Sequence, residues 1–190
     1  MAAPLILASA SPRRLALLAQ IGVTPDEVVT PGIEETPRRD EPPRDYVRRM
    51  AREKAHAAAR PGAYLLAADT VVAVGRRILP KAADAAEVRA CLALLSGRRH
   101  HVLTAVVLVG PEGAASERLT DTSVIFARLG REQVESYVAC GEGVGKAGGY
   151  AIQGRAAGLV RALSGSYSGV VGLPLFEVAQ LLRGRGYPVP

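Results

Sequence analysis

Short apolar runs alternate along this chain with stretches in which apolar residues recur every three or four positions. Contiguous apolar runs bounded by glycine and proline are typical of buried strands, whereas the longer spacing indicates amphipathic helices. The pattern predicts strands at residues 5–8, 28–29, 64–74, 101–109, 123–129 and 159–163. It predicts helices at residues 13–20, 45–59, 84–95, 131–139 and 173–182.

The order of these elements favours an α/β fold. Strands and helices mix without strict alternation, which indicates a mixed sheet flanked by helices. Residues 101–109 and 123–129 are joined through Gly-Pro-Glu-Gly and are expected to pair as a long antiparallel hairpin. With 190 residues and neither an internal repeat nor a linker, the whole chain (residues 1–190) is expected to form a single domain, with two small lobes sharing a cleft as one arrangement.

The composition narrows the class of protein. Apolar residues make up 48% and charged residues 22%, a balance that excludes a disordered chain. The net charge of +6 predicts attraction to polyanions, which include nucleotides, nucleic acids and anionic membranes. Because no long run of like charge occurs, the charge alone favours none of the three.

Cysteine usage and hydropathy indicate the compartment. Cys91 and Cys140 lack CxxC spacing, so neither a zinc site nor a disulfide framework is indicated, and both thiols are expected to be reduced. The first apolar run has no basic residue before it and is interpreted as a strand, not a signal peptide. No run approaches the roughly 18 apolar residues of a spanning helix. We therefore expect a soluble, cytoplasmic protein.

Asp69 stands inside the apolar run of residues 64–74. A buried carboxylate costs several kcal/mol unless it is paired, hydrogen-bonded or bound to a metal, so a structural salt bridge and a functional role are both open. Glu34 and Glu35 lie on a proline-rich loop that could reach the same cleft. Two or three carboxylates suit Mg²⁺ or Mn²⁺, although a solvated acidic loop explains the two glutamates equally well.

Two further features suit phosphate. Ser9, Ser11, Arg13 and Arg14 lie at the entrance to the first predicted helix, where free backbone N–H groups and the helix dipole attract anions. The alternative is that Ser11 caps the helix while the arginines face solvent. The side chains of Lys54 and Lys81 could each meet a phosphate or remain on the surface.

Other enzyme classes lack their motifs here. The glycine-rich segment at residues 145–154 contains neither GxxxxGK[ST] nor GxGxxG, so a P-loop and a dinucleotide site are not supported. No GxSxG occurs, and the three histidines lack metal-ligand spacing, which disfavours a serine hydrolase and a zinc enzyme.

Taken together, the segments LILASASPRR, EETP, AREKA, AADTVV, LSGRRHHVLTAV, GKAGGYAIQG and GSYSGVVGLPLFE resemble the successive motifs of the Maf family. They run in the family's order from residue 5 to residue 177. The resemblance implies an elongated α/β fold similar to that of inosine triphosphatases, with two lobes around a central nucleotide cleft. It also implies a cytoplasmic homodimer that hydrolyses nucleoside triphosphates to the monophosphate and pyrophosphate with Mg²⁺ or Mn²⁺.

The resemblance assigns roles to individual residues. Asp69 matches the family's proton acceptor and Glu35 an acidic catalytic or metal residue, so that both are the candidate metal ligands. The matched phosphate-binding residues are Ser9, Arg13, Arg14, Lys54 and Lys81. The positions tied to substrate choice are Arg13, Thr70 and Gln153, and the AIQG form resembles the subgroup that acts on dTTP and UTP rather than on 7-methyl-GTP.

One motif departs from the family, which usually reads Gly-Lys-Pro where this chain has Pro80-Lys81-Ala82. Lys81 is retained, but its loop can be set differently. The alternative function is a nucleic-acid-binding or cell-division regulatory protein without turnover, which a net charge of +6 permits. Few aromatic residues argue against a base-stacking platform, so we expect no stable nucleic-acid partner and no membrane partner.

Overall fold

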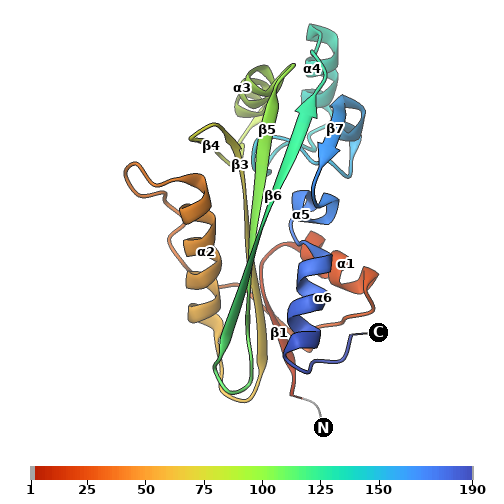
Figure 1. The fold of residues 1–190 in the computed structure, drawn as a ribbon. Helices are drawn as coiled ribbons and strands as arrows, with labels where there is room; N and C mark the ends of the chain where they lie inside the picture. The colour runs from red at the N-terminus through yellow and green to blue at the C-terminus, as the bar shows by residue number, and fades with distance from the viewer. Residues whose placement is uncertain (1–2, 190) are drawn as a thin grey trace.

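The computed structural model describes residues 3–189 and confirms a mixed α/β sheet with helices on both faces (Figure 1). The sheet has the strand order β2-β1-β3-β5-β6-β7, with β4 paired to β3. The strands are β1 (Leu5–Ala8), β2 (Glu27–Val29), β3 (Tyr64–Val74), β4 (Arg77–Leu79), β5 (Arg99–Val109), β6 (Ala115–Phe126) and β7 (Val160–Ser164). The helices are α1 (Pro12–Gln20), α2 (Pro43–Ala58), α3 (Ala85–Leu95), α4 (Arg131–Ala139), α5 (Tyr167–Val171) and α6 (Leu175–Gly184), with a 3₁₀ turn at Arg155–Leu159.

Three hydrophobic clusters divide the molecule into two lobes. In one lobe, α1 and α6 cover one face of the sheet and α2 covers the other (Figure 1). In the second lobe, α3 and α4 pack with the far ends of the long strands around Phe126. Because β3 and β5 run through both lobes, their middle residues lie where the lobes meet. The two-lobed arrangement expected from the family resemblance is confirmed.

Strand β3 is buried along almost its whole length because both of its faces are covered. Helix α2 packs on it through an apolar stripe that includes Val47, Met50 and Ala51, and Lys54 continues the same stripe by one turn. Residues three and four apart share one face of a helix, so the sequence of α2 aims Lys54 at the sheet. The cationic side chain therefore meets β3 at Asp69.

Two elements depart most from the sequence prediction, and the bounds of several others shift by one or two residues. Strand β6 begins at Ala115, eight positions before the predicted start, because its first half is mostly polar and half-buried and is held as a strand by its pairing with β5. The predicted helix at residues 173–182 is α6, shifted to Leu175–Gly184, and a further helix that was not predicted, α5, precedes it at Tyr167–Val171. Gly172, with φ of +139°, and Pro174 separate them, since neither conformation continues a helix.

Within residues 3–189 no helix is long and apolar enough to cross a membrane. Cys91 and Cys140 are both free thiols, as the sequence predicted.

Candidate active site

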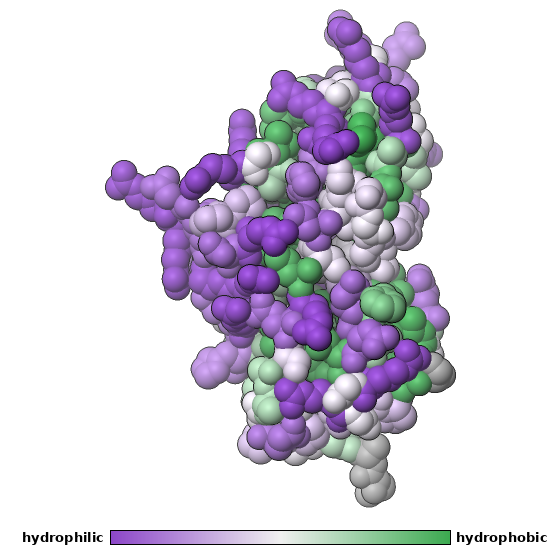
Figure 2. Space-filling view, viewed as in Figure 1, coloured by the Kyte–Doolittle hydropathy of each residue, from purple (hydrophilic) through white to green (hydrophobic). Residues whose placement is uncertain are grey.

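A cavity of about 370 Å³ opens at the junction of the two lobes. Its walls come from the β1–α1 loop, α2, the middle of β3, the segment after β4, residues 145–153 and the end of α5. All nine site residues predicted from the sequence line it, namely Ser9, Arg13, Arg14, Glu35, Lys54, Asp69, Thr70, Lys81 and Gln153. Figure 2 shows hydrophilic side chains concentrated over α2 and its preceding loop, beside this junction.

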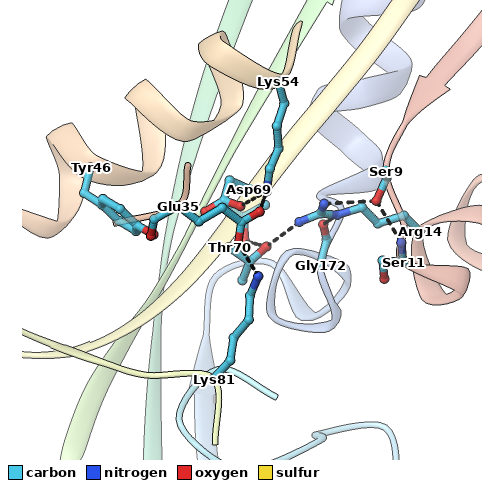
Figure 3. Close-up of polar contacts among 11 residues, drawn as sticks. Ser9, Ser11, Arg14, Glu35, Tyr46, Lys54, Asp69, Thr70, Lys81 and Gly172 are labelled. Atoms are coloured by element: carbon cyan, nitrogen blue, oxygen red, sulfur yellow. Dashed lines mark hydrogen bonds and ion pairs between the residues drawn. The ribbon is translucent and has the colours of Figure 1, made fainter. Parts of the chain in front are cut away.

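Two carboxylates and two ammonium groups form a cluster in the cavity (Figure 3). Lys54 Nζ lies 2.6 Å from Asp69 Oδ1 and 2.6 Å from Glu35 Oε1. Lys81 Nζ lies 2.5 Å from Glu35 Oε2. Asp69 and Lys54 are buried, whereas Glu35 and Lys81 are open to solvent on one side. The salt bridge considered for Asp69 therefore exists, and it lies within the cavity instead of in the core.

Glu35 is held ionised by this cluster. Burial raises the pKa of its carboxyl, but the hydrogen bonds and charges of Lys54 and Lys81 outweigh burial and lower the pKa to about 2. Tyr46 fixes the Glu35 backbone, since its hydroxyl donates a 2.8 Å hydrogen bond to the Glu35 carbonyl oxygen. Burial and the charges of Asp69 and Glu35 raise the pKa of Tyr46 to about 12, so this hydroxyl stays protonated.

Arg14 is buried and its hydrogen bonds go to neutral groups. Its Nε donates to the Gly172 carbonyl oxygen at 2.7 Å, Nη1 to Ser9 Oγ at 3.2 Å and Nη2 to Thr70 Oγ1 at 3.4 Å. Burial lowers the pKa of the guanidinium, and the charge of Asp69 opposes this only in part. A buried cation with fixed geometry and no carboxylate in contact is suited to receive an anion.

The β1–α1 loop places the hydroxyls at the entrance to α1. Ser9 Oγ accepts a 3.1 Å hydrogen bond from Ser11 N, and the side chain of Ser11 makes no capping bond with the helix. The capping alternative for Ser11 is therefore wrong. Arg13, in the first turn of α1, is half-buried at the cavity wall, where burial lowers its pKa.

Thr70 belongs to a chain of hydrogen bonds behind the cavity. Its Oγ1 lies 3.0 Å from Thr104 Oγ1, and Thr104 donates to the Gly169 carbonyl oxygen at 2.8 Å. This chain ties Arg14 to β3, β5 and α5. By contrast, Gln153 lies exposed at the cavity wall, and within residues 3–189 its side chain has no hydrogen-bond partner.

Some predictions about the site need amendment. Glu34 points away from the cavity into a separate groove that it shares with Arg52 and His56, so only one of the two adjacent glutamates joins the cluster. Lys81 reaches Glu35 despite the departure in its motif. Its loop is set by residues 145–149, because Gly148 N donates to the Pro80 carbonyl oxygen at 3.0 Å.

Lys146 and Tyr150 also line the cavity, and the sequence analysis missed both. The available signal was Lys146 as the one cation in the glycine-rich segment at residues 145–154, where glycine lets the backbone approach a ligand closely. Tyr150 is buried, and its hydroxyl lies 2.8 Å from His100 Nε2. Its position in the strand-free segment gives no periodic signal of burial.

The carboxylates of Glu35 and Asp69 are compatible with one divalent cation. Both carboxylates contact the ammonium nitrogen of Lys54, so they are close enough together to bind one cation jointly. Across residues 3–189 no group of three or more acidic, histidine or cysteine side chains could hold a metal ion. Mg²⁺ characteristically takes one or two protein carboxylates and completes its shell with water and substrate phosphate. The donor set therefore fits a cation shared with a phosphorylated substrate.

Two known relatives resemble this chain along nearly its full length. A relative from Caulobacter vibrioides, named dTTP/UTP pyrophosphatase, is 60% identical over 185 residues and 96% of each chain. A relative of the same name from Gluconobacter oxydans is 61% identical over 188 residues, 95% of this chain and 86% of its own. A solved dITP/XTP pyrophosphatase from Mycobacterium abscessus shares 27% identity over 66% of this chain and 73% of its own, with a TM-score of 0.41. The Maf-like protein family model matches residues 4–185, and the chain therefore belongs to the Maf family.

Proposed function

We propose that this protein is a nucleoside triphosphate pyrophosphatase that hydrolyses dTTP and UTP to the monophosphate and pyrophosphate. The observation that carries the proposal is the 60% identity, across 96% of both chains, to a relative named dTTP/UTP pyrophosphatase. The chemistry of the cavity agrees with it. Four cationic side chains (Arg13, Arg14, Lys54 and Lys81) suit a triphosphate, and the two carboxylates suit activation of water.

The reaction begins with a water molecule placed between Asp69 and the α-phosphorus. Asp69 accepts a proton from this water, and the oxygen attacks the α-phosphorus. The bond from the α-phosphorus to the oxygen that bridges to the β-phosphorus then breaks, and pyrophosphate leaves. Positioning and charge neutralisation supply most of the rate enhancement in such displacements, and no covalent intermediate is required.

The cations of the cluster take part by exchanging partners. Lys54 and Lys81 hold Glu35 and Asp69 when the cavity has no substrate, and their ammonium groups turn to phosphate oxygens when the triphosphate enters. Arg14 keeps its place because three neutral acceptors fix it. The carboxylates released by Lys54 are then free to act on water and on a metal ion.

Mg²⁺ or Mn²⁺, bound by Glu35 and Asp69, would polarise the phosphate oxygens and neutralise charge on the departing pyrophosphate. Glu35 and Asp69 suit this binding because both carboxylates contact one ammonium nitrogen and so lie close together. Gln153, Thr70 and Arg13 set the choice of base, with Gln153 contacting the pyrimidine directly.

We also propose that residues 1–190 act as a single catalytic domain, in a cytoplasmic homodimer that requires neither nucleic acid nor a membrane. The match of the family model to residues 4–185 supports the single domain. The two free thiols are consistent with a reducing compartment.

Pyrophosphate release from dTTP, UTP, CTP, GTP and ATP, measured with Mg²⁺ and with Mn²⁺, tests the function. We expect rapid release from dTTP and UTP and none in the presence of excess chelator. If the purified protein releases no pyrophosphate from any of the five but binds a nucleic acid, the regulatory alternative replaces the enzyme.

A further inference from the structure

Arg13 and Lys146 bring two cations to the same cavity from separate segments, the first turn of α1 and the glycine-rich residues 141–149. In the part of the chain that the structure describes, neither forms an ion pair with a carboxylate. The ammonium of Lys146 has one hydrogen-bond acceptor, the Val144 carbonyl oxygen of its own loop, at the long distance of 3.3 Å. Both cations are thus open to a ligand.

This arrangement contrasts with the other lysines of the cavity. Lys54 and Lys81 are paired with Glu35 and Asp69, so at that end of the cavity the charges of the two lysines are compensated by carboxylates. Around Lys146, burial lowers the pKa of the ammonium and the charge of Arg13 lowers it further. Two like charges that repel across a partly buried space are unfavourable until an anion lies between them.

The backbone of Lys146 is held in place by the segment that carries Lys81. Gly145 N donates to the Ala82 carbonyl oxygen at 2.7 Å, and Ala82 N donates to the Lys146 carbonyl oxygen at 3.1 Å. Gly145 and Gly148 adopt φ of +72° and +67°, values that a residue with a Cβ rarely adopts, so the tight course of this loop requires glycine. The loop therefore presents Lys146 from a fixed backbone position.

We propose that Lys146 is a further substrate-binding residue, which together with Arg13 holds the β- and γ-phosphates, the part of the nucleotide that leaves as pyrophosphate. This inference rests on the proposed function. The α-phosphorus must lie beside Asp69 for water to attack it, which places it at the end of the cavity where Lys54 and Lys81 are paired with carboxylates. The terminal phosphates carry most of the negative charge and are matched by Arg13 and Lys146, which within residues 3–189 form no ion pair.

The test uses Lys146→Met, the charge-preserving Lys146→Arg, and Arg161→Met as a control that removes one exposed charge from β7 outside the cavity. Calorimetry measures binding of inorganic pyrophosphate and of dTMP to each full-length variant, and steady-state kinetics gives kcat and KM for dTTP. Lys146 is in no ion pair within residues 3–189, so its loss should leave the thermal transition unchanged. In Lys146→Met, the dissociation constant for pyrophosphate and the KM for dTTP should each rise by roughly tenfold to a hundredfold.

Lys146→Arg should recover most of this binding, whereas Arg161→Met and the dTMP affinities should match the parent. Unchanged pyrophosphate binding in Lys146→Met overturns the inference. A loss of dTMP binding with pyrophosphate binding intact also overturns it, because Lys146 would then contact the nucleoside end. Calorimetry measures binding without turnover. A parent protein that binds pyrophosphate but hydrolyses no nucleotide therefore refutes the proposed function, while the effect of Lys146→Met on pyrophosphate binding can still be measured.

Discussion

The buried ammonium of Lys54 lies 2.6 Å from the buried carboxylate of Asp69. Removal of either partner from a buried pair leaves an uncompensated charge, and the cost to folding typically reaches about 3–5 kcal/mol. Here Glu35 provides a second carboxylate for Lys54, also at 2.6 Å, so the ammonium keeps a partner if Asp69 loses its charge. Stability and activity can therefore be separated at Asp69 more cleanly than at Lys54.

Asp69→Asn should fold normally and lose most of its activity. The amide is isosteric and preserves packing in β3, but it cannot accept the proton of water or bind a metal ion as a carboxylate does. We expect kcat for dTTP to fall by about a hundredfold or more, the scale of general-base contributions. Asp121→Asn is the matched control, because Asp121 pairs with Arg44 and His101 outside the cavity. Near-parental turnover by a folded Asp69→Asn would make Asp69 structural.

Replacement of the two lysines should separate binding from stability. Lys54→Ala, and to a smaller extent Lys81→Ala, should weaken transition-state stabilisation by about 1.5–3 kcal/mol, the range for a charge-assisted contact. Lys54→Ala should also lower the thermal transition, because it leaves Asp69 without its ion pair. Lys81 is exposed, so its loss should barely affect stability. If kcat and KM match the parental values in both variants, neither lysine contributes to substrate binding or catalysis.

The outline of the fold could be predicted from the sequence, because it depends on local patterns. The apolar run of β3, broken by Asp69 and Thr70, and the apolar stripe of α2 each specify one element and the face that it buries. The first half of β6 could not be predicted in this way, because its polar residues become a strand only by pairing with β5. Its conformation depends on a partner and not on its own composition.

The residues of the candidate site likewise differ in whether local sequence or tertiary contacts determine their role. Asp69 could be identified because burial of a carboxylate in an apolar strand costs free energy unless the group is paired or bound to a ligand. The other residues were identified from the family motifs. Which glutamate enters the cavity could not be predicted, since Glu34 and Glu35 are neighbours on one loop and only tertiary contacts with Lys54 and Lys81 distinguish them. Lys146 was missed for a similar reason, because its environment consists of backbone from a segment more than sixty positions away.

Glu35 should couple stability to pH. Its pKa in the folded protein is about 2, below its ordinary value of 4.5, so the folded state favours the ionised form. The stabilising contribution is complete above pH 4.5 and is lost as the pH falls toward 2. The free energy of unfolding of Glu35→Gln, measured with urea, should therefore differ most from the parent near neutral pH and converge with it in acid. Glu34→Gln, outside the cavity, should follow the parent throughout, and a constant gap for Glu35→Gln would contradict this coupling.

Gln153 provides the test of base selection. It lies at the cavity wall, and within residues 3–189 its carboxamide has no hydrogen-bond partner, so both its donor and its acceptor are available. Uracil and thymine present O4, N3–H and O2, which require one partner of each kind. The backbone at Gly148 and Gly149 packs against Val72 and Val88, leaving this wall of the cavity little freedom to retreat from a larger base.

Gln153→Ala should therefore reduce selectivity more than stability. A site built on polar contacts rejects the wrong base because polar groups are left without partners, at a cost of about 1–3 kcal/mol for each lost contact. We expect kcat/KM for dTTP and UTP to fall by about tenfold or more, with smaller changes for GTP and ATP.

Gln153→Glu, which keeps the shape but loses the amide donor, should show an intermediate or larger loss. Gln180→Ala, on the exposed face of α6, controls for removal of an unrelated glutamine. The five triphosphates are compared by kcat/KM in the parent and in each variant. Gln153 has no role in specificity if the parental profile is flat, or if a selective profile survives Gln153→Ala.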